Sequence, residues 1–142
     1  MFFSKSEEQR IVAAIREAES RTSGEIRLFV EPFCMSDDPV QKAAELFELL
    51  GMTQTQARNG VLLYLAYESK HFAIWGDEGI HERVGFDFWN AEKRLLRERL
   101  QRGETVLGLC EVILQIGEQL SRHFPADQNN NRNELPDEII YG

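Results

Sequence analysis

The sequence predicts an α/β fold, a three-layer α/β/α sandwich around a small, mixed and Rossmann-like β-sheet. Segments with apolar residues at helical spacing alternate with short apolar runs that are typical of strands. The run 61–66 is apolar almost throughout, which indicates a strand that helices bury on both faces. A helix separates the first two strands and only a short loop joins the second to the third. The sheet should therefore contain both a parallel and an antiparallel pair.

The length and charge of the chain limit its organisation and its partners. The 142 residues correspond to one domain, which we assign to residues 1–124, followed at 125–142 by a polar linker and a tail that we expect to dock on the domain. The formal net charge of −8 argues against a broad nucleic-acid or anionic membrane surface, because such partners reward clustered Lys and Arg. An acidic surface is compatible with a cation site, but it also simply keeps a protein solvated.

The first half of the chain contains a helix, a strand and a second helix. Ser4 and Glu7 form a capping box, which predicts a helix at the N-terminus. Apolar residues then predict a strand over 25–30. Asp38 followed by Pro39 is a strong signal for the start of the second helix, with Asp as the capping residue.

The second half of the chain begins with a hairpin. The Asn59–Gly60 turn precedes the apolar strand 61–66, and a short polar loop leads to the next strand at 71–75. Such a short connection requires antiparallel neighbours. Three helices should follow, over residues 80–84, 88–100 and 104–123.

Three features of the sequence bear on its location. The N-terminus lacks the basic start and apolar core of a signal peptide, and no apolar run approaches the ~20 residues that span a bilayer. Cys34 and Cys110 lie far apart in the chain and form no CxxC motif, which is typical of free thiols in a reducing compartment. A disulfide between the two cysteines is the alternative. We therefore expect a cytoplasmic protein without a membrane or nucleic-acid partner.

The predicted topology brings three glycine-containing turns to one edge of the sheet. The starts of the first two strands and the end of the third share this edge, which carries Glu25, Asn59, Asp77 and Glu78. Carboxylate and amide oxygens bind hard cations, so these four residues form a candidate metal site for Ca²⁺, or alternatively for Mg²⁺. The glycines that flank Asp77 and Glu78 would let the backbone approach closely. The same residue types also make ordinary turns without any ligand.

A second acidic group is predicted at the opposite edge of the sheet. It consists of Glu31, Asp37, Asp38, Glu68 and His71. Because Asp38 already has a capping role and Glu68 suits a hairpin loop, we rank this group below the first as a metal site.

Several segments carry a family resemblance. They are residues 23–27 (Ser-Gly-Glu-Ile-Arg), 43–51, 58–66 (Arg-Asn-Gly-Val-Leu-Leu-Tyr-Leu-Ala), 74–80 (Ile-Trp-Gly-Asp-Glu-Gly-Ile) and the late helical stretch 100–120. Together they resemble the TPM domain, a family named for plant thylakoid acid-phosphatase-like proteins. The resemblance implies an α/β/α sandwich, binding of divalent cations (chiefly calcium) through acidic residues, and the weak acid phosphatase activity reported for plant members. The chain looks like the short, stand-alone bacterial branch of the family.

Three functions follow as hypotheses. The first is a Ca²⁺-binding domain that acts as an interaction or regulatory module. The alternative is a weak, metal-assisted acid phosphatase in which Arg58 clamps the phosphate, although the sequence has no known phosphatase loop or nucleophile motif. The third is a pure interaction domain, whose unknown protein partner would contact the aromatic residues at 86–89 and the apolar tail at 139–141.

Overall fold

The computed structural model of the protein describes residues 2–126 and 137–142. Its helices and strands, in chain order, are α1 (Lys5–Glu19), β1 (Glu25–Glu31), α2 (Pro39–Leu49), the 3₁₀ turn η1 (Met52–Gln54), β2 (Gly60–Ala66), β3 (His71–Gly76), α3 (Glu78–Gln101), α4 (Thr105–His123) and β4 (Ile140–Tyr141). The four strands form one sheet in the order β3-β2-β1-β4. The predicted α/β class and mixed sheet are therefore confirmed.

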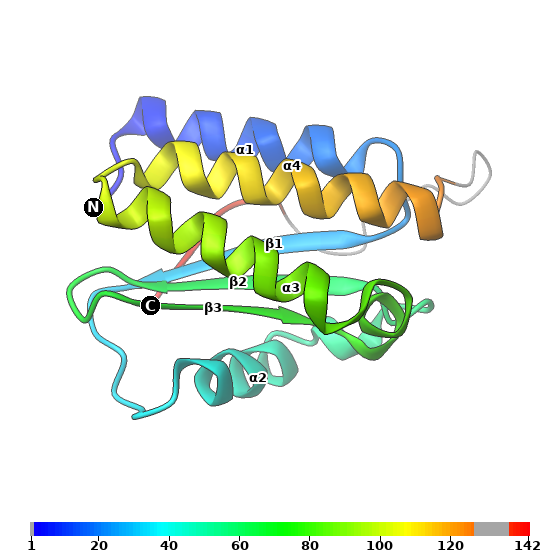
Figure 1. Cartoon of the computed structure of the whole chain (residues 1–142), viewed down its shortest axis with the longest axis horizontal. Coiled ribbons are helices and arrows are strands. Elements are labelled where there is room, and N and C mark those ends of the chain that lie inside the picture. Colours follow the sequence, from blue (N-terminus) through cyan, green and yellow to red (C-terminus); the bar gives the residue numbers. More distant parts are fainter. Residues whose placement is uncertain (1, 127–136) are drawn as a thin grey trace.

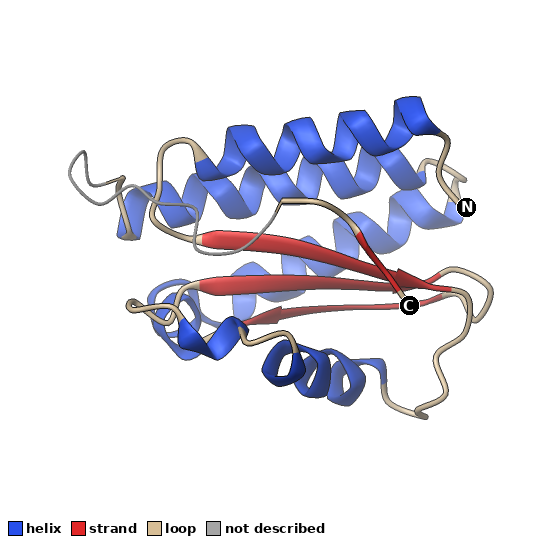
Figure 2. Ribbon diagram, turned by 180° about the vertical axis from the view of Figure 1, so that it is seen from behind, coloured by secondary structure: helices blue, strands red, loops and turns tan. Residues whose placement is uncertain are grey.

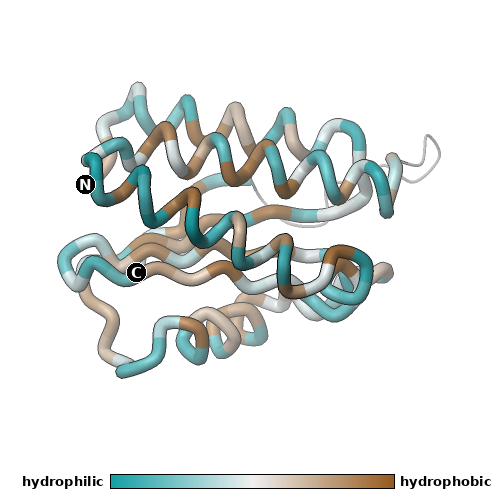
Figure 3. The backbone as a smooth tube through the Cα atoms, in the orientation of Figure 1, coloured by the Kyte–Doolittle hydropathy of each residue, from teal (hydrophilic) through white to brown (hydrophobic). Residues whose placement is uncertain are grey.

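Helices cover both faces of the sheet, as the predicted three-layer sandwich requires. α1, α3 and α4 lie on one face and α2 lies on the other (Figure 1). All seven residues of β2 are buried; Leu63 belongs to the core beneath the three helices, whereas Leu62 belongs to the core beneath α2. Along the helices, hydrophilic and hydrophobic residues alternate (Figure 3), because each helix buries only one side.

The strand pairings follow the lengths of the connections. β1 and β2 are parallel and are joined through α2, whereas β2 and β3 are antiparallel and form the predicted hairpin. β4 is parallel to β1, with Val30 opposite Tyr141, and the Gly142 amide donates to the Val30 carbonyl at 2.8 Å. The C-terminal residues thus lie beside β1 at the sheet edge away from β3 (Figure 2).

Local signals place the helix starts where the sequence predicts them. The Ser4 hydroxyl accepts from the Glu7 amide at 3.1 Å, and the Glu7 carboxylate accepts from the Ser4 amide at 2.8 Å, so the capping box is confirmed. The Asp38 carboxylate accepts from the Val40 amide at 3.0 Å and caps α2. Both cysteines are free thiols, as expected.

The two helices predicted over residues 80–84 and 88–100 are both present in α3, on either side of a kink. α3 spans 24 residues, and Gly85 between its two parts is not helical. Gly85 has φ 75° and ψ 177°, a conformation that glycine adopts readily because it has no Cβ. The interruption bends α3 where it passes the end of β3.

Candidate functional site

The three turns predicted to converge lie at one edge of the sheet. Glu25 is opposite Gly60 in the parallel pair, and Val61 is opposite Gly76 in the hairpin. The starts of β1 and β2 and the end of β3 therefore share this edge. The topological part of the sequence prediction is confirmed.

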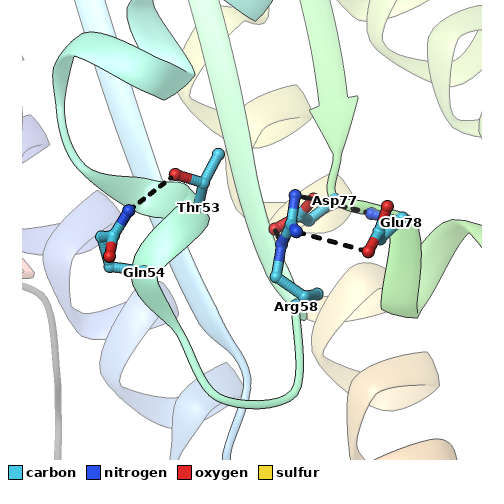
Figure 4. Close-up of polar contacts among 5 residues, drawn as sticks. All are labelled: Thr53, Gln54, Arg58, Asp77 and Glu78. Carbon is cyan, nitrogen blue, oxygen red and sulfur yellow. Dashed lines mark hydrogen bonds and ion pairs between the residues drawn. The ribbon is translucent and has the colours of Figure 1, made fainter.

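An ion pair between Arg58 and Asp77 occupies the β2–β3 part of this edge (Figure 4). Arg58 Nε and Nη2 donate to the two carboxylate oxygens of Asp77 at 2.7 and 2.8 Å, a bidentate geometry. The Asp77 side chain is 5% exposed and that of Arg58 is 40% exposed, so a buried carboxylate lies beneath a guanidinium that reaches solvent. The hydrogen bonds to Asp77 raise the pKa of Arg58 above its ordinary value.

Asp77 also caps α3, and Glu78 contributes a second carboxylate to the same cation. The Asp77 side chain accepts from the Glu78 amide at 2.8 Å. Arg58 Nη1 lies 3.3 Å from Glu78 Oε1. Two carboxylates therefore converge on one positively charged group at the start of a helix.

The glycine that follows Glu78 permits a close approach of the backbone. The Gly79 amide donates to the Arg58 carbonyl at 2.8 Å. A Cβ at Gly79 would overlap the carbonyl oxygen of Ala57 and lie 2.6 Å from that of Arg58. This bears out the expected role of the glycine and places two backbone carbonyls beside the start of α3.

The other two predicted residues lie on the neighbouring strands. Asn59 is buried and its side-chain amide donates to the Ser23 hydroxyl at 3.1 Å. Glu25 is buried at the start of β1, where its charge acts on Glu19 and Arg27. Because β1 and β3 flank β2, the backbones at Glu25 and Asp77 are separated by two strand spacings, roughly 10 Å.

Sequence reasoning missed a group of carboxyl side chains near Glu25. Glu19, at the end of α1, accepts from the Ile26 amide at 2.8 Å and is hydrogen-bonded to Asp137. Burial and then the hydrogen bond with Asp137 raise the pKa of Glu19 well above its ordinary value. Arg16 lies 3.5 Å from the Asp137 carboxylate. No sequence signal pointed to this group, because Glu19 and Asp137 are far apart in the chain.

The four predicted metal ligands share an edge, but only Asp77 and Glu78 converge on one cationic group. Within residues 2–126 and 137–142, no group of three or more His, Cys, Asp and Glu side chains has an arrangement suited to a metal ion. In the second acidic group, Asp38 caps α2 and Glu31 accepts from the Tyr64 hydroxyl. Both side chains therefore have structural partners.

A surface groove begins at the Arg58–Asp77 pair and follows the second half of β3, from Ile74 to Gly76. We call it the β3 groove; it has a volume of about 690 Å³ and is lined by α2, β3 and α3, among others by Glu45, Glu48, Trp75, Glu78, Phe86 and Lys93. This volume is in the range of ligand pockets in proteins. The sequence indicated the aromatic residues of its α3 wall, but not the groove itself.

Comparisons with known proteins agree with the fold and the edge motifs described above. A family model described as TPM domain matches residues 1–119. The NMR structure of the BA42 protein from the psychrophilic bacterium Bizionia argentinensis is similar at 38% sequence identity and a TM-score of 0.91, over 100% of this chain and 97% of that one. The N-terminal domain of the cg2496 protein from Corynebacterium glutamicum has the same fold, with a TM-score of 0.68 and 17% identity over 84% and 75% of the two chains. No curated protein matches the chain.

The fold and its glycine-rich edge define a small α/β/α domain with a mixed sheet. The chain belongs to the TPM domain family. Among the described helices, none combines the length and apolar composition that crossing a bilayer requires.

Proposed function

We propose that this TPM domain binds a divalent cation, Ca²⁺ in preference to Mg²⁺, and acts as an interaction or regulatory module. The observation that supports the proposal is the convergence of Asp77 and Glu78 on one positive group, the Arg58 guanidinium. A cation that replaced this group would meet the carboxylate oxygens of Asp77 and Glu78. Such oxygens are the ligands of Ca²⁺, which tolerates irregular coordination better than Mg²⁺.

Binding of the cation would release Arg58, whose side chain already reaches solvent. The competition with Arg58 weakens binding, and so does the positive end of the α3 dipole. We therefore expect a weak site, with a Kd of roughly 0.1–1 mM. Release of Arg58 would change the charge at one end of the β3 groove, which gives the site a regulatory role.

The test is a titration of the metal-free protein with Ca²⁺, followed by amide NMR, with Mg²⁺ as the control. We expect Ca²⁺ to change the amide chemical shifts of Asn59, Gly60 and Asp77–Gly79. These changes should be absent in the Asp77→Asn variant. Asparagine retains the helix cap but removes the charge. The matched control Asp37→Asn should bind normally. Shifts confined to the second acidic group around Asp37 and Glu68, or no shifts at all, would contradict the proposal.

Metal-assisted phosphatase activity stays a prediction. It requires Arg58 to bind phosphate, whereas Arg58 Nε and Nη2 donate to Asp77 in the structure. Cation binding would have to free Arg58 first. Hydrolysis of an aryl phosphate that requires both Ca²⁺ and Arg58 would support this activity.

A further inference from the structure

We propose that the β3 groove binds an extended, basic peptide segment of a partner protein, which joins the sheet as a strand beside β3. The proposal rests on the free outer edge of β3, on the walls of the groove and on its charge. It goes beyond cation binding at Asp77 and Glu78 and does not require a metal. The partner is defined by its chemistry: an exposed segment with alternating apolar and Lys or Arg residues.

The floor of the groove is the outer edge of β3, where Ile74, Trp75 and Gly76 line it. β3 is the terminal strand of the sheet order β3-β2-β1-β4. The Asp77 amide donates to the Gly60 carbonyl at 2.9 Å, which makes these two residues a hydrogen-bonded pair. Because such pairs alternate in an antiparallel ladder, the backbone groups of Phe72, Ile74 and Gly76 point away from β2. Within the described part of the chain, no hydrogen bond engages these groups.

Two helices form the walls of the groove. In Figure 1, β3 lies between α3 and α2, which pack on opposite faces of the sheet. α2 contributes Gln41, Glu45 and Glu48, which share one helix face because they are spaced by four and three residues. The α3 wall contains Phe86 and Trp89. A strand added to β3 would therefore pair its backbone with the floor and place its side chains against both walls.

The aromatic part of the α3 wall is held in place before any partner binds. Phe86 is 73% exposed and packs edge-to-face on His81, with 4.6 Å between ring centroids. Trp89 Nε1 donates to His81 Nδ1 at 3.1 Å, which links the two sides of the interruption at Gly85. An exposed aromatic side chain in a fixed position is a typical anchor for an apolar residue of a partner.

The charge of the groove selects a basic partner. Four carboxylates line it, those of Glu45, Glu48, Asp77 and Glu78, against the cations Arg58 and Lys93. Arg58 is already paired with Asp77, so the remaining field is negative. A second copy of this chain is disfavoured, since neither its acidic C-terminal tail nor its own β3 groove complements this charge.

The experiment uses the full chain in EDTA, which removes divalent cations. Its result therefore does not depend on whether the protein binds Ca²⁺. The probe is a capped octapeptide of alternating Lys and Val, followed by amide NMR and hydrogen exchange. We expect chemical-shift changes and slower amide exchange at Ile74 and Gly76, which line the groove. A Glu-Val octapeptide should bind at least tenfold more weakly. Two N-methylated forms of the Lys-Val peptide separate backbone pairing from charge. One carries the methyl groups on the Lys amides and the other on the Val amides. At least one of them should bind tenfold or more weakly than the unmodified peptide.

A charge-reversal variant completes the test. Glu45→Lys combined with Glu48→Lys should weaken the Lys-Val peptide at least tenfold and strengthen the Glu-Val peptide. Glu98→Lys, an exposed position on α3 that does not line the groove, should bind within twofold of the natural chain. Equal affinity for all peptides, full binding by both N-methylated forms, or shifts away from β3 would overturn the proposal. So would a stable dimer whose β3 amides are protected without peptide.

Discussion

Arg58 and Asp77 connect the turn before β2 to the cap of α3 through two parallel hydrogen bonds of 2.7 and 2.8 Å. Arg58 has φ 51°, which lies in the left-handed region that non-glycine residues rarely adopt. Its side chain extends from this turn to Asp77 (Figure 4). The pair fixes the relative position of two turns that are distant in the sequence, and the Gly79 amide reinforces it through its bond to the Arg58 carbonyl.

The first prediction concerns the two roles of Asp77. Asp77→Ala removes both the cap of α3 and the partner of Arg58, so we expect a loss of about 2–4 kcal/mol in the free energy of unfolding. Asp77→Asn keeps the cap and should lose about 1 kcal/mol less. Urea unfolding followed by circular dichroism measures both values. Equal losses in the two variants would mean that the cap contributes nothing.

The second prediction concerns the close approach at Gly79. Gly79→Ala places a methyl group against the backbone carbonyls of Ala57 and Arg58, which cannot rotate away as a side chain can. We expect the free energy of unfolding to fall by about 2–4 kcal/mol. Gly60→Ala is the control at the same edge: its nearest contact is the Phe47 ring at 3.3 Å, and it should cost less. Thermal unfolding of both variants provides the comparison; a Gly79→Ala protein as stable as Gly60→Ala would contradict it.

The third prediction concerns the pH dependence of C-terminal docking. The pKa of Glu19 is raised, which means that the docked state holds the proton of this carboxyl group more tightly. The resulting stabilisation of the docked tail is complete when the pH is below 4.5, the ordinary pKa of Glu. It declines as the pH rises above 4.5. Glu19→Gln imitates the protonated side chain, and docking should then depend less on pH. Exchange of the Gly142 amide, which donates to Val30, reports on docking. The exposed neighbour Glu17→Gln should keep the pH dependence of the natural chain.

The fourth prediction concerns Glu92, which is buried between α3 and α4. Burial raises its pKa to about 7. The folded protein therefore holds a proton that the unfolded chain releases, and stability should fall by about 1–3 kcal/mol as the pH rises from 4.5 to 7. Glu92→Gln should remove this decline and stabilise the protein above pH 7. Urea unfolding at several pH values tests it, with Glu98→Gln as the exposed control; an unchanged decline would rule out Glu92 as its source.

Much of the fold could be predicted because its signals are local. Ser4 and Glu7 cap one helix, Asp38 caps another, and the apolar strand 60–66 requires cover on both faces. The hairpin and the crossover then follow from loop length. The shared edge of the candidate site followed from the same topology.

The rest depends on contacts between residues that are distant in the sequence. The sequence identified Asp77 and Glu78 as carboxylates at an edge, but it did not reveal that Arg58 would occupy the space between them. Likewise, nothing local links Glu19 to Asp137.

The burial of β2 on both faces has a consequence for how the sheet reaches its correct alignment. In a strand with one polar face, a slip of one residue would expose the apolar side chains and is strongly penalised. β2 lacks this safeguard, since all seven of its residues are buried. Its alignment must therefore come from its neighbours: from β1, whose Glu25 and Ile26 differ sharply in polarity, and from the length of the hairpin that leads to β3. Substitutions in that hairpin, at the edge of the sheet opposite the Arg58–Asp77 pair, are the ones that would produce misaligned and aggregation-prone molecules.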